Sequence, residues 1–277
     1  MILAIDIGNT TCSFGVFARP GLRPGRAGER GKLEGHFSIG TQTSRTPDEI
    51  TLQLKALAKT HKLHLSRASQ IIVCSVVPRM SALLIQALRS LEDVPIRVVG
   101  QDLTVPLVNR YTYPEQVGQD RLVGAYAAWT RFRNACIVAD FGTAITIDVV
   151  TKAGEYLGGV IVPGLEISLE ALATRTALLP KVELKEPPEL LGRDTANSIR
   201  SGLIHGCAAL CDGLIGQLKA QHAPKATVVA TGGASPLITK YAASLQHLRP
   251  HLVLEGLAAL ASPGQPAQSA SKTRRSK

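Results

Sequence analysis

The stretch AIDIGNTTCSFGVF, residues 4–17, places a polar turn between two apolar segments almost at the start of the chain. The apolar residues on either side predict two strands, 2–5 and 13–17. A plain hairpin turn needs only residues such as Gly8 and Asn9. This turn adds a carboxylate and three hydroxyl groups, from Asp6, Thr10, Thr11 and Ser13. The turn therefore carries more polar chemistry than a change of chain direction requires.

A second stretch, CIVADFGTAITIDVV (136–150), repeats the same order of features. When Asp140 is aligned with Asp6, the next polar positions also align, Gly142 with Gly8 and Thr143 with Asn9. The spacing of 134 residues is about half of the 277-residue chain. A repeat of this length predicts two similar α/β domains rather than a solenoid.

Apolar patterns predict the elements between and after the two turns. The run IIVCSVVP (71–78) predicts a buried parallel strand, and further strands are expected at 96–99 and 226–234. Helical spacing predicts a helix over 47–63, with Thr46 as its N-cap and Pro47 in its first turn. Further helices are expected at 79–91, 119–132, 165–176 and 195–221. Residues 18–35 are interpreted as a mobile loop, and 262–277 as a disordered basic tail.

Composition indicates a globular protein with 45% apolar and 19% charged residues. The net charge of +10 invites a nucleic-acid interpretation, but the loop 18–35 contributes +3 and the tail contributes +4. Aromatic residues make up only 4% of the chain and are not interleaved with basic residues. Solvated charge on flexible segments is favoured, and no nucleic-acid partner is expected.

Cysteine usage and the N-terminal residues suggest a cytoplasmic location. The chain has five cysteines without a CxxC pair, which favours buried free thiols over a zinc site. The N-terminus carries an early acid and no basic segment, so no signal peptide is expected. No apolar run is long enough to cross a bilayer, so no membrane partner is expected either.

The two turns suggest a device that binds phosphate. Neither a P-loop nor a dinucleotide fingerprint occurs in the chain. Gly8 and Gly142 would let backbone N–H groups approach an anion, and Asp6 and Asp140 could bind the accompanying cation. Ordinary hairpins with a turn-favouring aspartate are the alternative. The duplication, and the dipeptide Gly232-Gly233 after an apolar strand, favour a nucleotide gripped between two domains.

The segment YTYPEQVGQDR (111–121) lies between the two turns and precedes an apolar helix. Near a cleft, Asp120 could accept the proton of an acceptor hydroxyl, and Gly118 would permit close approach of the substrate. Arg121 beside it is expected to help keep Asp120 ionised at neutral pH. Equally, Asp120 could be an ordinary first-turn acid and Arg121 a surface base.

The motifs together resemble the type III pantothenate kinase family, whose members belong to the sugar kinase/Hsp70/actin group of ATP-binding proteins. The matching segments are DIGNT (6–10), YTYPEQVGQDR (111–121), DFGTAITID (140–148), GGVIVPG (158–164), LGRDTANSIRSG (191–202) and TGG (231–233). The resemblance implies two duplicated ribonuclease H-like (actin-like ATPase) domains with a nucleotide cleft between them. It places these domains at 1–115 and 116–261. The implied reaction is the ATP-dependent phosphorylation of pantothenate, the first step of coenzyme A biosynthesis.

The resemblance also implies a role for each site residue. ATP would contact Asp6, Ile7, Gly8, Asn9, Thr10, Thr11, Cys12, Ser13 and Thr143. Pantothenate would contact Tyr111, Gly118, Gln119, Asp120, Arg121 and Thr195, the last of these from the partner subunit of a homodimer. Asp120 would be the proton acceptor. Asp140 would bind a monovalent cation, potassium or ammonium, and Mg²⁺ would accompany the nucleotide.

Two alternatives remain open at this point. Some relatives were first described as transcriptional accessory factors, and the basic tail is the only support for that role here. Another small-molecule kinase of the same superfamily, such as an acetate or sugar kinase, is the second alternative. The set formed by Tyr111, Gly118–Arg121 and Thr195 discriminates against it.

Overall fold

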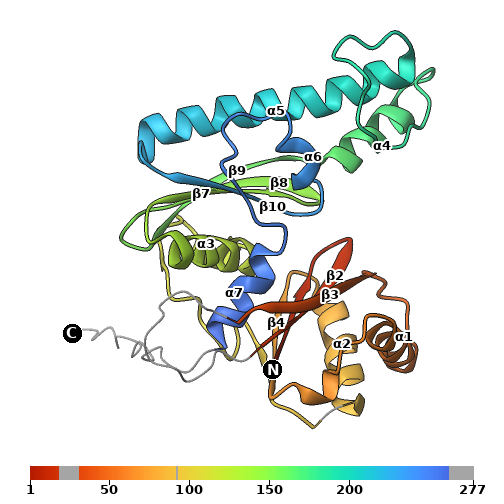
Figure 1. Ribbon diagram of the computed structural model, residues 1–277, viewed down its shortest axis with the longest axis vertical. Helices are drawn as coiled ribbons and strands as arrows, with labels where there is room; N and C mark the ends of the chain where they lie inside the picture. The colour runs from red at the N-terminus through yellow and green to blue at the C-terminus, as the bar shows by residue number, and fades with distance from the viewer. Residues whose placement is uncertain (19–30, 92, 262–277) are drawn as a thin grey trace, which may run out of the picture.

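The computed structural model describes residues 1–18, 31–91 and 93–261, which form two β-sheets with helices around and between them (Figure 1). The first sheet has the strand order β3-β2-β1-β4-β5. Its strands are β1 (Ile2–Ile7), β2 (Thr11–Phe17), β3 (Leu33–Gly40), β4 (Gln70–Ser75) and β5 (Ile96–Val98). β1 is antiparallel to β2 and parallel to β4.

The second sheet has the strand order β11-β10-β7-β8-β9-β6. Its strands are β6 (Val108–Asn109), β7 (Cys136–Phe141), β8 (Ala144–Val150), β9 (Glu155–Pro163), β10 (Thr227–Thr231) and β11 (His247–Leu248). Apart from β6, this sheet repeats the first one strand for strand: β7 is antiparallel to β8 and parallel to β10. The expectation of a duplicated α/β fold is confirmed.

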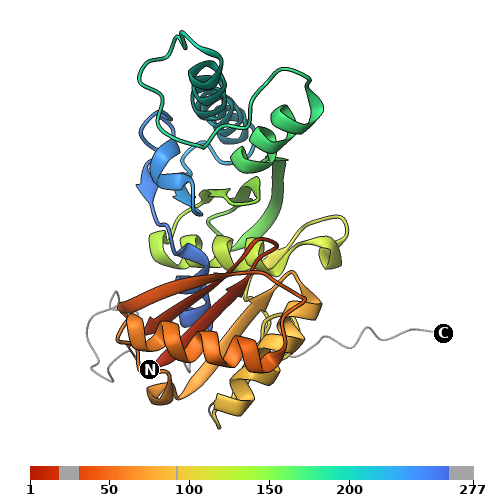
Figure 2. The same ribbon diagram turned by 90° about the vertical axis from the view of Figure 1, so that its right-hand side faces the viewer.

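Seven α-helices cover the sheets, and two views at right angles show their arrangement within the described ranges (Figures 1 and 2). They are α1 (Pro47–Thr60), α2 (Pro78–Leu91), α3 (Gln119–Phe132), α4 (Leu165–Arg175), α5 (Thr195–His222), α6 (Ser235–Ile238) and α7 (Leu252–Leu260). Two short 3₁₀ helices, Leu65–Arg67 and Pro114–Gln116, complete the list. α1 and α2 cover the outer face of the first sheet, and α5 lies across the outer face of the second.

Strand alternation divides the apolar side chains between the two faces of each sheet. In β1, Leu3 and Ile5 pack toward α1 and α2, whereas Ile2 and Ala4 point into a central core. In β7, Ile137 packs on the α5 side and Cys136 on the central side. The central core is shared by both sheets and by α3 and α7. The two inner faces therefore look toward each other.

The two central helices exchange sheets. α3 follows the first sheet along the chain but packs against β7 and β8 of the second. α7 follows the second sheet but packs against β1, β2 and β4 of the first, and α3 and α7 pack against each other. The buried leucines of α7 belong to the central core: Leu252, Leu254, Leu257 and Leu260. This exchange joins the two lobes through a continuous apolar layer.

Most predicted elements occur in the structure, with shifted ends. The helix at α1 has the expected N-cap Thr46, completed by a capping box with Glu49, but it ends at Thr60 rather than Leu63. The strand expected over 71–78 ends at Ser75, because Pro78 starts α2 instead. The loop expected over 18–35 is too long at its C-terminal end, since β3 begins at Leu33. The remainder of that loop, 19–30, and the tail 262–277 lie outside the described residues.

No helix in the described parts of the chain is both long and apolar enough to span a membrane.

Candidate active site between the two sheets

The turn after β1 and the turn after β7 are built alike. The burial of successive residues follows the same sequence in β1 and β7, and nearly the same in β2 and β8. The strand registers reveal one difference: Asp6 pairs with Ser13, whereas Asp140 pairs with Thr146. The second turn is therefore one residue shorter than the first. One residue of the first turn therefore has no counterpart in the second turn. The alignment of Thr143 with Asn9 without a gap holds only for the residues before this missing position.

The glycine amides are occupied within the turns themselves. The N–H of Gly8 donates to Thr11 O at 3.0 Å, and the N–H of Gly142 donates to Ala144 O at 3.2 Å. The next amides, of Asn9, Thr10 and Thr143, have no backbone acceptor within the described residues. These amides, rather than those of the glycines, are the donors that can face an anion.

The tips of the two turns meet across the interface between the lobes. The hydroxyl oxygens of Thr10 and Thr143 lie 2.8 Å apart. Thr41, just after β3, braces the first turn, because its N–H donates to Thr10 O at 2.9 Å and its hydroxyl donates to Gly8 O at 2.7 Å. The pattern of the sequence had not singled out Thr41. The structure thus brings the predicted phosphate residues Thr10 and Thr143 together.

Asp6 and Asp140 occupy equivalent positions on the inner faces of the two sheets. Asp6 continues the series Ile2 and Ala4, and Asp140 continues the corresponding series in β7. Burial, with the nearby charges of Asp120 and Asp140, raises the pKa of Asp6 to about 8. Burial, with Asp120 and Asp148, raises the pKa of Asp140 to about 7. Carboxyl groups held in this way ionise readily only when a positive charge comes close.

Asp6 also has a buried carboxylate oxygen, Oδ1, without a hydrogen-bond partner. An orphaned buried acceptor of this kind is costly unless something completes it, and an oxygen-preferring cation would do so. However, no three His, Cys, Asp or Glu side chains among the described residues form a complete metal cage. The donor set fits a cation whose remaining ligands come from phosphate oxygens and water.

Asp120 lies in the first turn of α3, with Gly118 as the N-cap of that helix. Its Oδ1 accepts the N–H of Arg121 at 2.8 Å. A Cβ on Gly118 would lie 2.4 Å from this oxygen, so a side chain there would push the carboxylate out of its present position. Burial raises the pKa of Asp120, and the charge of Arg121 lowers it only as a lesser effect. The N–H of Arg121 lowers it as well, so Arg121 favours the ionised form of Asp120 as expected, but burial outweighs its effect.

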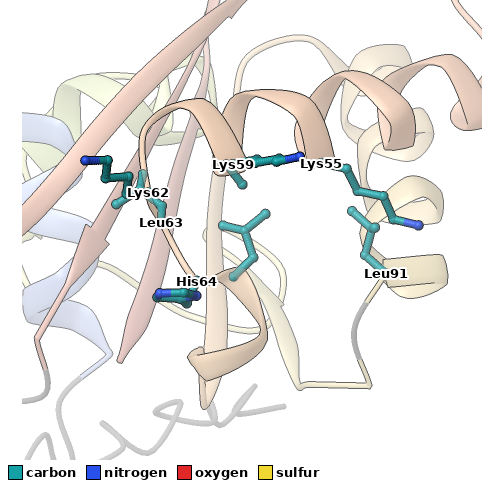
Figure 3. Close-up of a pocket in the computed structure, with 8 residues that line it drawn as sticks. Lys55, Lys59, Lys62, Leu63, His64 and Leu91 are labelled. Carbon is teal, nitrogen blue, oxygen red and sulfur yellow. The ribbon is translucent and has the colours of Figure 1, made fainter.

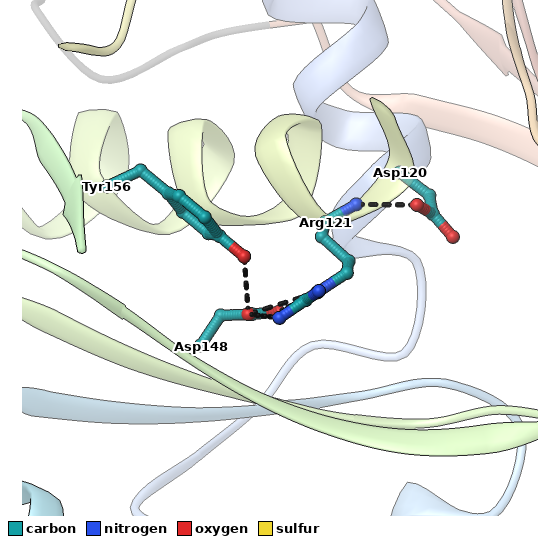
Figure 4. A network of polar contacts seen from close by, with 4 residues as sticks. All are labelled: Asp120, Arg121, Asp148 and Tyr156. Atoms are coloured by element: carbon teal, nitrogen blue, oxygen red, sulfur yellow. Dashed lines mark hydrogen bonds and ion pairs between the residues drawn. The ribbon is translucent and has the colours of Figure 1, made fainter. Parts of the chain in front are cut away.

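The Arg121 guanidinium binds a different carboxylate, that of Asp148 on β8 (Figure 4). Nη2 lies 2.6 Å from Asp148 Oδ1, and Nε lies 3.1 Å from the same oxygen. Tyr156 on β9 donates its hydroxyl to Asp148 Oδ1 at 2.7 Å. These two partners belong to the buried surroundings of the site and were not predicted as site residues. A carboxylate in the middle of the apolar segment TAITIDVV was the available signal.

The other predicted substrate residues occupy different surroundings. Tyr111 packs its ring against Gly158, where a Cβ would lie 3.1 Å from Tyr111 Cδ2. Gln119 starts α3 and packs its side chain against Gly100, which has φ +87°. Thr195 starts α5 at an exposed position, and within the described chain no hydrogen bond joins it to the other predicted residues. Tyr111 is nevertheless close enough to Arg121 for their charges to interact, whereas Thr195 lies apart from the other predicted residues.

Gly232, directly after β10, lies against Asp140. Its φ of +87° is in the left-handed region, and a Cβ there would lie 2.3 Å from Asp140 Oδ1 and 2.7 Å from Phe141 N. Its neighbour Gly233 has open space around it. The first glycine of the TGG motif is therefore needed for the placement of Asp140, whereas the second leaves room for a ligand.

A pocket of about 640 Å³ occurs elsewhere, on the first lobe (Figure 3). It lies between the C-terminal ends of α1 and α2, with an apolar floor that includes Leu63, Leu65 and Leu91. Its polar residues are Lys55, Lys59, Lys62 and His64. None of the predicted site residues lines it. Most of the predicted site residues lie between the two sheets, and this pocket is separate from them.

A family model and individual relatives of known name indicate the same family for this chain. The family model described as type III pantothenate kinase matches residues 2–217. A type III pantothenate kinase of Anaeromyxobacter dehalogenans is 40% identical over 257 residues, which covers 93% of this chain and 97% of that protein. One from Rubrobacter xylanophilus is 40% identical over 266 residues, covering 94% and 97%.

Solved structures with a similar fold come from proteins of low sequence identity. A Campylobacter jejuni protein described as a Baf family transcriptional activator has a TM-score of 0.55 at 17% identity, covering 93% of this chain and 96% of that one. A Sinorhizobium meliloti protein described as a 2-dehydro-3-deoxygalactonokinase has a TM-score of 0.54 at 15% identity, covering 94% and 98%. At such identities these likenesses show the fold alone, and the fold is that of the actin-like ATPases and sugar kinases.

Proposed function

Because the chain belongs to the type III pantothenate kinase family, it is a transferase that phosphorylates pantothenate in coenzyme A biosynthesis, and we propose how its residues divide this work. The observation that carries the proposal is the convergence of Asp6, Asp120 and Asp140 between the two inner sheet faces, where burial first, and then the charge of Asp120, raises the pKa of both Asp6 and Asp140. A complete set of this kind favours an enzyme over a transcriptional accessory factor.

The two turns hold the phosphates of ATP. The amides of Asn9, Thr10 and Thr143 and the hydroxyls of the two threonines supply donors from both lobes. The rest of the predicted contact set is Asp6, Ile7, Gly8, Thr11, Cys12 and Ser13. Phosphoryl transfer requires positioning and charge compensation more than covalent chemistry from the protein. Donors from two lobes would fix the nucleotide in the cleft between them.

Asp6 and Asp140 bind cations. Mg²⁺ on the nucleotide, when bound, neutralises charge on the transferred phosphate. Asp6, with its unpaired buried oxygen, would help to hold the nucleotide's Mg²⁺, and Asp140 would hold the monovalent cation, potassium or ammonium. The raised pKa values of both carboxyl groups support this assignment, since each group is held ready to exchange a proton for a cation.

Asp120 acts as the general base toward the primary hydroxyl of pantothenate. Its carboxylate is held by the Arg121 N–H at one end, and Gly118 keeps the space beside it open. Burial raises its pKa toward the range in which a carboxylate accepts a proton effectively at neutral pH. The acceptor itself would lie against Tyr111 and residues 118–121, with Gln119 and Arg121 as donors.

A homodimer would complete the acceptor site with Thr195 of the second subunit. Large apolar side chains are exposed on β9, on α4 and in the loop that leads to Thr195. They are Ile161, Ile167, Leu178, Leu190 and Leu191. Their exposure supports burial against a second copy. The molar mass in solution, measured by light scattering at several concentrations, tests this.

The remaining assignments concern domains and surroundings. We place the domain boundary between residues 115 and 116, although β6 already pairs with β9 and α7 returns to the first sheet. The five cysteines are all free and buried, which supports a cytoplasmic location. We expect neither a nucleic acid nor a membrane as partner.

The decisive experiment measures ADP release by the purified protein with Mg-ATP and a panel of acceptors. Pantothenate should be phosphorylated, and acetate and glucose should give little activity. Comparable activity on glucose would overturn the substrate assignment. Absence of turnover with every acceptor, together with normal folding, would favour a regulatory protein.

A further inference from the structure

Asp148 and Tyr156 lie one layer behind the residues that would contact the acceptor. We propose that they are positioning residues, which hold the Arg121 guanidinium in the single orientation that serves the bound acceptor. The proposal rests on the proposed function, because it concerns how the pantothenate site is kept in shape. It assigns a role to two residues that touch neither ATP nor the acceptor.

The geometry around Asp148 is closed on the side of the sheet. Arg121 and Asp148 have side-chain exposures of 10% and 3% respectively. Asp148 accepts from Nε and Nη2 of Arg121 and from the hydroxyl of Tyr156, so three donors converge on one carboxylate. A Cβ on Gly159 would lie 2.5 Å from Asp148 Oδ1, so the backbone of β9 passes directly against the carboxylate. Asp148 therefore has little freedom to turn away from Arg121.

Stability alone is a poor reason for this cluster. Taking an ion pair out of water is costly, and well-packed apolar residues often serve a core equally well. A buried, hydrogen-bonded ion pair does supply a fixed side-chain orientation. The orientation of the Arg121 guanidinium matters because Arg121 directly follows Asp120, the proposed base. Its third nitrogen, Nη1, makes no hydrogen bond with the described residues and is not one of the buried unpaired atoms. Two of the three guanidinium nitrogens thus anchor the group, and one remains for a ligand.

The acceptor-site residues surround the same guanidinium. The charge states of Arg121 and Tyr156 respond to Tyr111, whose ring packs on Gly158 two residues beyond Tyr156. Burial first, and then Asp148, raises the pKa of the Tyr156 hydroxyl, so it stays a proton donor to Asp148. Although burial opposes the charge of Arg121, its bonds to Asp148 raise the pKa of Arg121. Arg121 therefore stays charged and Tyr156 stays protonated, so the hydrogen bonds between them and Asp148 keep one arrangement.

The test uses the full chain and compares KM for pantothenate with KM for ATP. Tyr156→Phe removes one hydroxyl without changing any charge, and it should raise the pantothenate KM about fivefold while the ATP KM changes less than about twofold. Asp148→Asn should raise the pantothenate KM more than tenfold. A matched control is available at Glu186, whose exposed carboxylate binds Lys240 and the hydroxyl of Tyr241. Glu186→Gln and Tyr241→Phe should leave both KM values unchanged.

A double-mutant cycle separates positioning from a general structural role. If Asp148 acts through Arg121, adding Asp148→Asn to Arg121→Gln should raise the pantothenate KM no further than Arg121→Gln alone. Additive effects, or equal increases in both KM values, would overturn the inference. If Asp148→Asn fails to fold, Tyr156→Phe still tests the positioning role. An unchanged pantothenate KM in Tyr156→Phe would also overturn that role. A wild-type protein that does not phosphorylate pantothenate would instead refute the proposed function.

Discussion

The hydroxyl oxygens of Thr10 and Thr143 lie 2.8 Å apart, although 133 residues separate them along the chain. They come from corresponding turns of the two sheets, so the two copies of the internal repeat contact each other at the interface between the lobes. The same point is where we propose that ATP phosphates bind.

Thr143→Ala should weaken ATP binding, because it removes the hydroxyl donor that the second lobe supplies. The expected increase in ATP KM is about tenfold, the loss of one hydrogen bond to a charged group, with the pantothenate KM unchanged. Thr143→Ser keeps the hydroxyl and serves as the control. An unchanged ATP KM in Thr143→Ala would exclude Thr143 from the nucleotide site.

Asp120→Asn should lower kcat by about 10²–10⁴-fold, the usual cost of losing a general base. The side chain keeps its shape, so ATP affinity, measured separately by equilibrium binding, should persist. A near-normal kcat would mean that another residue accepts the proton or that none is needed.

The pH dependence of the wild type gives a second test of Asp120. A base works only when deprotonated, and burial raises the pKa of Asp120 above 3.8. The rate should therefore fall with decreasing pH at a value above the usual range of aspartate. Asp6 and Asp140, with pKa values of about 8 and about 7, titrate in the same cluster, so the measured value belongs to the group. If the rate instead stays unchanged as the pH is lowered to 4, Asp120 is not a buried base with a raised pKa.

Asp6→Asn should weaken Mg-ATP binding and stabilise the apo-protein at alkaline pH. The folded protein holds the Asp6 proton up to about pH 8, whereas the unfolded chain loses it near pH 3.8. An acid whose pKa is raised on folding costs stability as pH increases from 3.8 through 8, and asparagine carries no such cost. The difference in melting temperature between the variant and the wild type should therefore grow from pH 5 to pH 8. A difference independent of pH would count against a buried, protonated Asp6.

Gly232→Ala should abolish activity, because its Cβ would collide with Asp140 Oδ1 and with the backbone of Phe141. The left-handed φ of Gly232 adds strain to the substitution. Gly233→Ala is the matched control, since nothing lies within 4 Å of its Cβ, and the variant should fold normally. Comparing melting temperature and kcat of the two variants checks the prediction, and equal behaviour would contradict it.

Replacing potassium by sodium should sharply reduce turnover if a weakly hydrated monovalent ion shares the phosphate charge with Asp140. The assay compares kcat in potassium, ammonium and sodium buffers at constant ionic strength. Unchanged turnover in buffer free of potassium and ammonium would remove the monovalent cation from the proposal.

The sequence predicted the duplication because the repeat lies in adjacent residues, where strand alternation and turn chemistry are visible. Asp6 and Asp140 could be found in this way, and so could Asp120 at a helix start. Asp148 and Tyr156 could not be assigned, because their partner Arg121 is 27 residues away from Asp148 along the chain. For the same reason the sequence does not reveal that Arg121, which follows Asp120, binds Asp148 with its guanidinium. β3 was missed because it alternates between exposed and half-buried residues before its first fully buried one.

The return of α7 to the first sheet has a consequence for synthesis on the ribosome. One face of β1, β2 and β4 is covered by a helix that begins at Leu252, close to the end of the described chain. During translation, Ile2, Ala4 and Phe17 of the first lobe therefore stay uncovered on that side until α7 has emerged from the ribosome. These residues of β1 and β2 are synthesised long before the helix that buries them, and a chain truncated before Leu252 would present that apolar face to the chaperones of the cell.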